Sequence, residues 1–350
     1  MSFEVFRVRH RARRVRRTVR GLLVRGFAAA ASTLILACTL VVAAPAARAA
    51  DGDFAHWLAA FRHDAHARGI SNHVLDQALA NLAPIPRVIE LDRRQPEFTL
   101  TFDQYIAKVV PDSRVARGRE LLAENKDLLA NVTSVYGVQP QYIVALWGIE
   151  SDFGRIVGDF PIVPALATLA YDGRRSAYFR GELMDALMIL EHGYADLAHL
   201  RGSWAGAMGQ NQFMPSSYLR YAVDYHGNGK RDIWSDRGDV FASTANYLLH
   251  VGWNASEGWG RAVRLPKGFD SQLADLSVEK PVPEWNALGV RLPDGGLLPE
   301  SPSPASIVMP AGEGGPAYLV YGNYRAILKW NKSIFFATAV GLLADRIEGR

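Results

Sequence analysis

Apolar residues recur three and four positions apart over most of the chain after residue 50, so we expect a mainly helical protein. Prolines and glycines mark several helix ends: Pro84 and Pro86 are expected to end the first helix, and Pro140 and Gly154 bracket another. The expected helices cover residues 54–83, 113–136, 140–153, 161–171, 176–198, 215–222, 238–251 and 323–347, with an extended run and then a short helix within 86–112.

The pattern changes between residues 260 and 322. This stretch contains nine prolines, and the short runs 262–265 and 317–321 are typical of strands. We therefore expect a small module of strands and loops, least structured over 293–316, before the chain returns to helix. The fold class predicted from these patterns is mainly α, of the α+β type.

The first 50 residues have the composition of an export signal. They hold ten arginines and a single glutamate, followed by a nearly continuous apolar run from Phe27 to Ala47. The segment Ala47-Arg48-Ala49 provides a small-x-small cleavage pattern before Asp51. Two alternatives stay open: an uncleaved membrane anchor, and lipidation at Cys38.

Removing this leader reverses the charge of the protein. The whole chain has 39 basic and 35 acidic residues, whereas residues 51–350 have 29 and 34, a balance of −5. The basic character therefore gives no support to nucleic-acid binding. Cys38 is the only cysteine, so the exported part would have no disulfide and no thiolate metal site.

Glu150 is the first candidate for chemistry. It lies on the apolar face of the helix expected over 140–153, near its C-terminal end. Burial and the negative end of the helix dipole both disfavour the carboxylate, so both raise its pKa, as a general acid requires. The alternative is a structural glutamate paired with an arginine. Asp152, roughly 200° further around the helix, would not share its site, and Asp159 and Asp172 are candidates for a second carboxyl only by proximity.

Residues 202–218 form the second informative stretch. Small residues alternate with hydroxyl, amide and flat aromatic side chains, a mix that suits the polar rim and apolar faces of a sugar. The alternative is a tight loop that enters a helix at Pro215, with Ser216 and Ser217 as caps. The residue pattern leaves both interpretations open.

These stretches resemble the membrane-bound lytic murein transglycosylase B family, glycoside hydrolase family 103. The similar segments appear in the family's order and span most of residues 54–347. They are Ala-Leu-Trp-Gly-Ile-Glu-Ser (145–151), Thr-Leu-Ala-Tyr (168–171), Arg-Arg-Ser-Ala-Tyr-Phe (174–179), Gly-Ala-Met-Gly (206–209), Gln-Phe-Met-Pro-Ser (212–216), Ala-Asn-Tyr-Leu (245–248) and Trp-Asn-Lys-Ser (330–333).

The resemblance implies a lysozyme-like helical catalytic core with a small β module beside a groove. It also implies that the β-1,4 bond between N-acetylmuramic acid and N-acetylglucosamine in peptidoglycan is cleaved without water, leaving a 1,6-anhydro end. Glu150 would act first as acid and then as base, with no metal or cofactor. The implied divisions are an export signal (1–50), a catalytic domain (51–259), a strand and loop module (260–322) and a returning C-terminal helix (323–350).

The resemblance also assigns substrate-binding residues around Glu150. Arginines would suit a carboxylate of a muramoyl peptide. The residues carried over are Ser203, Gln212, Phe213, Arg174, Arg175, Tyr178, Tyr105, Tyr247, Asn331 and Phe335. Two structural alternatives stay open: Arg174-Arg175 as a solvated turn, and Tyr247 as a core residue with a satisfied hydroxyl.

The chain departs from the family at two places. Phe335 stands where the family usually has tyrosine, so a hydroxyl is lost while a stacking face remains. The loop 224–232 resembles half of an EF-hand calcium loop, with Asp224, Asn228 and Asp232 as donors. Because His226 and Ser235 stand where oxygen ligands and a glutamate belong, the loop is interpreted chiefly as a glycine-rich surface turn, with calcium as the alternative.

Two other functions remain open from the sequence. A muramidase on the same fold would need a second carboxyl about 5 Å or about 6.5–9.5 Å from Glu150, and a non-catalytic protein would only bind peptidoglycan. The expected partner is the peptidoglycan glycan strand, with no nucleic acid. The protein is expected to be a periplasmic monomer, and any partners in cell-wall synthesis or division are not identified by the sequence.

Overall fold

The computed structural model describes residues 46–94 and 100–349, with side chains from residue 53 onward. These residues belong to one compact unit that starts at Ala46. The expected export signal and Cys38 lie outside the described residues, so both stay predictions. Within the described ranges, none of the helices combines the length and the apolar character needed to cross a membrane.

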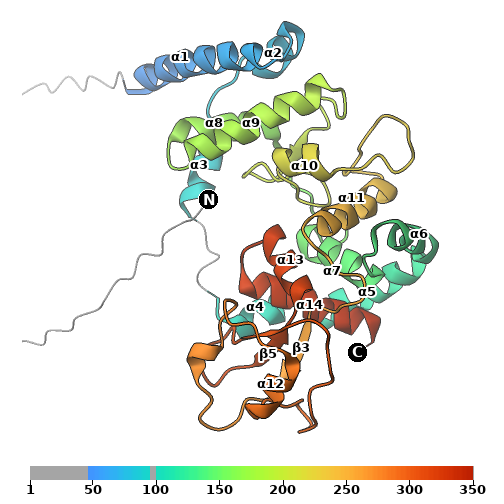
Figure 1. Cartoon of the computed structure of the whole chain (residues 1–350). Coiled ribbons are helices and arrows are strands. Elements are labelled where there is room, and N and C mark those ends of the chain that lie inside the picture. The colour runs from blue at the N-terminus through green and yellow to red at the C-terminus, as the bar shows by residue number, and fades with distance from the viewer. Residues whose placement is uncertain (1–45, 95–99, 350) are drawn as a thin grey trace, which may run out of the picture. The chain divides into compact units, whose positions relative to one another are not determined.

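Helices dominate the described chain (Figure 1). The helices are α1 (Ala46–Ala67), α2 (Asn72–Leu79), α3 (Pro86–Arg93), α4 (Phe102–Val109), α5 (Asp112–Glu124), α6 (Lys126–Tyr136), α7 (Pro140–Ser151), α8 (Ile162–Asp172), α9 (Ser176–Glu191), α10 (Pro215–Tyr221), α11 (Arg237–His250), α12 (Val282–Ala287), α13 (Gly322–Trp330) and α14 (Ile334–Glu348), with a short 3-10 helix at Ser271–Leu273. The strands are β1 (Phe160–Pro161), β2 (Arg201–Gly202), β3 (Gly260–Val263), β4 (Ser306–Val308) and β5 (Ala317–Val320).

The first predicted helix, 54–83, is in fact two. Gly69 adopts a φ of +94°, which ends the first segment, and Ser71 caps α2 by accepting the Val74 N–H. Ser71 also donates through its own N–H and hydroxyl to the carboxylate of Glu191, at the end of α9. The periodicity continued across the break because both helices bury an apolar face on the same core.

Three further predictions missed helix boundaries. The run expected to be extended after Pro86 is helix α3, because a proline at the first helical position is as compatible with a helix start as with a helix end. The helix predicted over 113–136 is broken at Asn125, whose backbone is not helical, although it ends at Gly137 as expected. The helix predicted over 323–347 is broken at residues 331–333 between α13 and α14.

Helix α7 forms the centre of the core. Nine of its twelve residues are buried, and it packs against α5, α6, α11 and α14. Figure 1 shows α7 among these helices, and α8 packs against α9. A helix buried on nearly all sides is apolar all around, which is why α7 stands out in the sequence.

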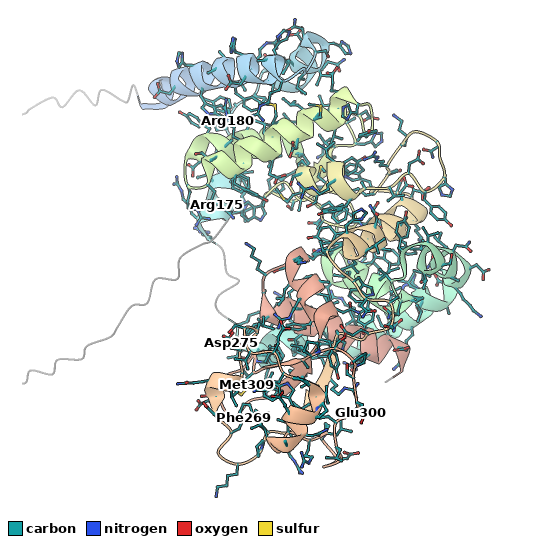
Figure 2. All side chains as sticks on the ribbon, in the orientation of Figure 1. Arg175, Arg180, Phe269, Asp275, Glu300 and Met309 are labelled. Carbon is teal, nitrogen blue, oxygen red and sulfur yellow. The ribbon has the colours of Figure 1, made fainter. Side chains whose placement is uncertain are left out.

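The strands expected between residues 260 and 322 form an antiparallel sheet in the order β3-β5-β4. Gly260 pairs with Val320, and Ser306 pairs with the same residue from the other side. This part of the chain has its own apolar cluster around the fully buried Trp285. Phe269 and Met309, labelled in Figure 2, pack against this cluster. Because the described unit is compact throughout, the domain divisions proposed from the sequence stay predictions.

A second, very small antiparallel ribbon shapes the loop that precedes α10. Phe160 pairs with Gly202, and single bridges link Gly202 to Met208 and Met208 to Phe213. Gly158 runs so close to the ribbon that a Cβ there would lie 2.3 Å from the Gly202 backbone, and its φ is +87°. Glycine at 158 is thus required for the turn after α7 to approach the 202–213 loop.

Candidate active site

Glu150 lies in the last turn of α7, as predicted. The helix ends at Ser151, two residues earlier than expected, because Asp152 adopts a left-handed conformation with a φ of +51°. Phe153 is also left-handed, and its ring folds back to within 5.5 Å of the Trp147 ring centroid. A Cβ on Gly148 would lie 2.7 Å from that ring. The glycine before Ile149-Glu150 therefore allows the turn to close against the helix.

The carboxyl of Glu150 is only partly exposed. Burial raises its pKa to about 7, while the hydrogen bond from the Trp330 indole lowers it. No charged side chain among residues 46–94 and 100–349 contributes to this pKa. The structural alternative, a glutamate paired with an arginine, is therefore not what these residues show: the carboxyl has an uncharged partner, and its raised pKa leaves both the acid and the carboxylate populated near neutral pH.

The hydrogen bond from Trp330 orients the Glu150 carboxyl. The indole Nε1 donates to Oε1 of Glu150 at 2.8 Å. An indole N–H can only donate, so Oε1 must act as an acceptor. The carbonyl oxygen of a protonated acid is its better acceptor, so this hydrogen bond favours Oε1 as the carbonyl oxygen and Oε2 as the oxygen that carries the proton.

Trp330 is held by two aromatic rings that the sequence comparison had assigned to substrate. The ring centroids of Phe213 and Tyr247 lie 5.1 and 4.7 Å from that of Trp330. Phe213 is 2% exposed, and the Tyr247 hydroxyl donates to the Lys329 carbonyl at 2.7 Å. These rings support the indole, and Tyr247 is buried with a satisfied hydroxyl, the structural alternative left open by the sequence. Direct substrate contact by Phe213 and Tyr247 stays a prediction.

Ser203 and Gln212 stabilise the loop before α10. The Ser203 hydroxyl accepts the Ala207 N–H at 3.0 Å. Gln212, at a φ of +51°, donates from its amide to the carbonyls of Gly209 and Val157. The second bond connects this loop to the turn that follows Glu150. Pro215 begins α10 as expected. The helix-entry role is therefore present, and substrate contact by either side chain stays a prediction.

Arg174 and Arg175 converge on one buried carboxylate of α3. Arg174 donates to both Oδ atoms of Asp92 at 2.7 Å, and Arg175 donates to Oδ1 at 3.0 Å. Figure 2 shows Arg175 at the end of α9 next to α3. The sequence left open a solvated turn or a ligand site. The structure shows half-exposed arginines held on Asp92, so their proposed contact with a peptide carboxylate stays a prediction.

We expect Asp92→Asn to destabilise the protein by about 2 kcal/mol at pH 7. Hydrogen bonding from Arg174 lowers the pKa of Asp92, so the carboxylate stabilises the fold above its ordinary pKa and loses this effect as the pH falls. Urea unfolding measures the change. The matched control is Asp64→Asn, which removes the solvent-exposed pair with Arg180 and should change stability much less than Asp92→Asn does. Equal losses for the two variants would contradict the assignment.

Tyr178 is 49% exposed, and burial is the main factor that raises the pKa of its hydroxyl to about 12. Its hydroxyl hydrogen-bonds the carboxyl of Glu182, a buried residue whose pKa burial also raises. Glu182 in turn accepts the N–H and hydroxyl of Ser216 in the first turn of α10. The sequence analysis missed Glu182, which connects the exposed tyrosine to the loop beside the active site.

Three predicted residues lie near the junction of α4, α13 and α14. The ring of Phe335 packs 5.3 Å from Phe102 and 5.7 Å from Tyr105, centroid to centroid. Asn331 caps α13, and its side-chain oxygen accepts the Ser333 N–H. The ring that replaces the family's tyrosine thus packs from the first turn of α14 against α4. Direct substrate contact by these three residues stays a prediction.

The carboxylates of the loop 224–232 face N–H groups of their own turn. Asp224 accepts from Asn228 and Gly229, and Asp232 accepts from Trp234 and Ser235. Within the described ranges, no three His, Cys, Asp or Glu side chains gather in a way that could hold a metal ion. These bonds are those of the surface turn, and calcium binding stays an untested alternative.

The candidates for a second catalytic carboxyl have other partners. Asp172 pairs with Arg93, and Asp152, which was expected not to share the site of Glu150, pairs with Arg155 and with Arg114. Asp159 is exposed. None of the three contributes to the raised pKa of Glu150. The geometry therefore offers one acid at this position without a close acidic partner.

Trp330 is the functional residue that sequence reasoning did not assign. It belongs to a quoted family segment, yet 180 residues separate it from Glu150. The signal that could have suggested a role was a large aromatic residue with a hydrogen-bond donor inside the helix expected over 323–347. Its partner could be identified only once α13 was placed against α7.

A mainly helical core that carries one neutral carboxyl at the end of its central helix defines a protein of the lysozyme-like class. Residues 53–345 match the family model described as the transglycosylase SLT domain. The chain belongs to this family. The resemblance and the fold class predicted from the sequence are therefore confirmed.

The chain is also similar to individual lytic transglycosylases. Membrane-bound lytic murein transglycosylase B of Escherichia coli (strain K12) is 34% identical over 255 residues, which are 70% of this chain and 66% of that protein. Crystal structures of SltB3 from Pseudomonas aeruginosa, in complex with NAG-NAM-pentapeptide and with NAG-anhNAM-pentapeptide, are 47% and 48% identical to this chain. Each superposes with a TM-score of 0.82 over 85% of this chain and 80% of that one.

Proposed function

We propose that this protein is a lytic transglycosylase that cleaves the β-1,4 bond between N-acetylmuramic acid and N-acetylglucosamine in peptidoglycan. The observation that carries the proposal is the Glu150 carboxyl, whose pKa is raised to about 7 with no second acid acting on it. The SltB3 complexes with NAG-NAM-pentapeptide and NAG-anhNAM-pentapeptide support the choice of substrate and product.

In the first step Glu150 acts as a general acid. Oε2 gives its proton to the bridging oxygen, and the bond from that oxygen to C1 of N-acetylmuramic acid breaks. N-acetylglucosamine leaves with a free 4-hydroxyl, and Glu150 becomes a carboxylate. The Trp330 N–H, already directed at Oε1, stabilises this developing charge.

In the second step the same carboxylate acts as a base. It takes the proton of the 6-hydroxyl on the muramic acid residue, and that oxygen bonds C1 to close the 1,6-anhydro ring. Glu150 returns to its protonated form, so protons and bonds balance over the cycle. Because the attacking oxygen belongs to the same sugar, proximity replaces an activated water, and this chemistry needs no metal, cofactor or second carboxyl.

The cellular location and the partner of the protein follow from this substrate. We propose that the protein acts in the periplasm after export, as a monomer on glycan strands, without a nucleic-acid partner. The relative in Escherichia coli is called membrane-bound, which supports action at the cell envelope. Retention of the membrane anchor, or lipidation at Cys38, would place the same activity at the membrane surface.

Product analysis distinguishes the transglycosylase from a hydrolase on the same fold. Residues 51–350 are incubated with purified sacculi, and the released muropeptides are analysed by mass spectrometry. A transglycosylase releases anhydro-muramoyl ends. A muramidase adds one water to each bond that it cuts and releases reducing ends, which are heavier by the mass of that water, about 18 Da. Reducing ends as the main product would contradict the proposal, and binding without release would favour a non-catalytic protein.

A further inference from the structure

A cavity of about 550 Å3 lies against the turn that follows Glu150. Its lining includes Arg114 and Arg117 from α5, Arg155 from the turn and Arg237 at the start of α11. Asp152 is the one acidic residue in the lining, which includes neither Glu150 nor Trp330. Helices α5, α7 and α11 are neighbours in Figure 1.

The positive charge of this cavity is only partly compensated. Arg117 pairs with Glu120 and Glu124, which lie outside the lining. Asp152 is shared by Arg155 and Arg114. The fourth arginine, Arg237, forms no ion pair within the described part of the chain. Three guanidinium groups therefore face one carboxylate.

The interactions that orient Arg237 are with uncharged groups. Its Nη1 donates to the Asn125 side-chain oxygen at 3.2 Å, and its guanidinium carbon lies 5.6 Å from the Trp147 ring centroid. Stacking on an indole holds a guanidinium in place while leaving its charge available to an anion. This arginine is therefore oriented without being neutralised.

Arg114 is also incompletely satisfied. Its Nη1 donates to the Val109 carbonyl, its Nη2 lies 3.4 Å from Asp152, and its buried Nε has no hydrogen-bond partner. Buried donors in folded proteins nearly always have partners, so an unpartnered one in a cationic cavity indicates a missing acceptor nearby. An anion in the cavity would supply the missing acceptor for this Nε, and the fold would not have to change.

We propose that this cavity binds an oxyanion, and that the oxyanion is a carboxylate of a peptidoglycan stem peptide. The planar fork of a guanidinium matches the two oxygens of a carboxylate, and Arg155 and Arg237 have exposed side chains that can adjust to it. The choice of a stem peptide rests on the proposed function, since a pentapeptide stem carries at least its C-terminal carboxylate. A bound carboxylate would hold the turn after α7 between α5 and α11.

Calorimetric titration tests the cavity directly. The full chain is titrated at low salt with three probes: a free pentapeptide stem without sugars, the same peptide with its carboxyl groups amidated, and inorganic phosphate. We expect the free peptide to bind, and both amidation and the double variant Arg155→Gln/Arg237→Gln to weaken binding at least about tenfold. The matched control Arg87→Gln/Arg94→Gln removes two exposed arginines that pair with Glu90 and should bind as the wild type does. The variant Arg174→Gln/Arg175→Gln tests the rival carboxylate site predicted from the sequence.

Three results would overturn the inference. Unchanged affinity in the Arg155→Gln/Arg237→Gln variant would remove the cavity as the site. Loss of binding in the Arg174→Gln/Arg175→Gln variant alone would move the site to α9. Binding of phosphate but not of peptide, lost in the first variant, would overturn the peptide as the source. Because the probes contain no glycan, a failure of the proposed cleavage activity would leave the binding result standing, and the two failures are distinguishable.

Discussion

Glu150→Gln should lower the rate of release of anhydro-muropeptides by at least about a thousandfold, because one carboxyl serves both proton transfers. Glutamine keeps the shape of the side chain and can accept the Trp330 hydrogen bond, but it can neither give nor take a proton at the leaving oxygen. The measurement is mass spectrometry of muropeptides released from sacculi by the purified variant. Release at the rate of the wild type would exclude Glu150 as the acid.

The matched controls are Asp159→Asn and Asp172→Asn. Both acids were considered as second carboxyls, and neither acts on the pKa of Glu150. We expect each variant to keep most of the activity. A loss in either that equals the loss in Glu150→Gln would favour the hydrolase, which needs a pair of carboxyls.

Glu150→Gln should also stabilise the fold at alkaline pH. The folded protein holds the Glu150 proton up to a pKa of about 7, whereas the unfolded chain releases it near 4.5, so stability falls as the pH rises between these values. At pH 8 the buried charge costs at most about 3 kcal/mol, which glutamine would recover. Urea unfolding at pH 4 and pH 8 should show a gain for Glu150→Gln only at pH 8. An equal effect at both values would contradict the raised pKa.

Trp330→Phe should have the second-largest effect and lower kcat about tenfold to hundredfold. This is the loss expected when a hydrogen bond to a charged group is removed. The variant keeps an aromatic ring against Phe213 and Tyr247 but cannot donate to Glu150. Because the indole N–H lowers the pKa of the carboxyl, its removal should raise that pKa above 7. The acid form would persist to higher pH, and the alkaline limb of the pH–rate profile would shift upward while the maximum falls.

Trp234→Phe is the control for this experiment. The Trp234 indole also donates a hydrogen bond, but to the carbonyl of Arg201 and not to Glu150. We expect its pH–rate profile to keep the position of the wild-type limb. A loss of rate in Trp330→Phe without a shift of the alkaline limb would show that the indole acts only by packing, and would contradict its positioning role.

Local patterns in the sequence were enough to place Glu150. Pro140, the apolar run after it and the position of the acid near the helix end all lie within a dozen residues, and periodicity acts over that range. The same local signals located α8, α10, β3 and β5. They missed β4, a buried strand inside the stretch 293–316 that was expected to be the least structured, because its pairing partner β5 lies outside the local sequence. They misplaced helix ends where a distant partner stabilises the break, as Glu191 does for Ser71.

The tertiary structure alone decided how the site is held and which expected residues face it. Trp330 meets Glu150 across 180 residues, and Asp92 holds Arg174 across 82. Phe213 and Tyr247 had the residue types of sugar contacts, but packing against α13 buries them. Periodicity and caps act between near neighbours along the chain, so the sequence determined the helices and the acid. Hydrogen bonds and burial depend on which elements meet, so only the folded chain determined that acid's protonation, its orientation and its supporting residues.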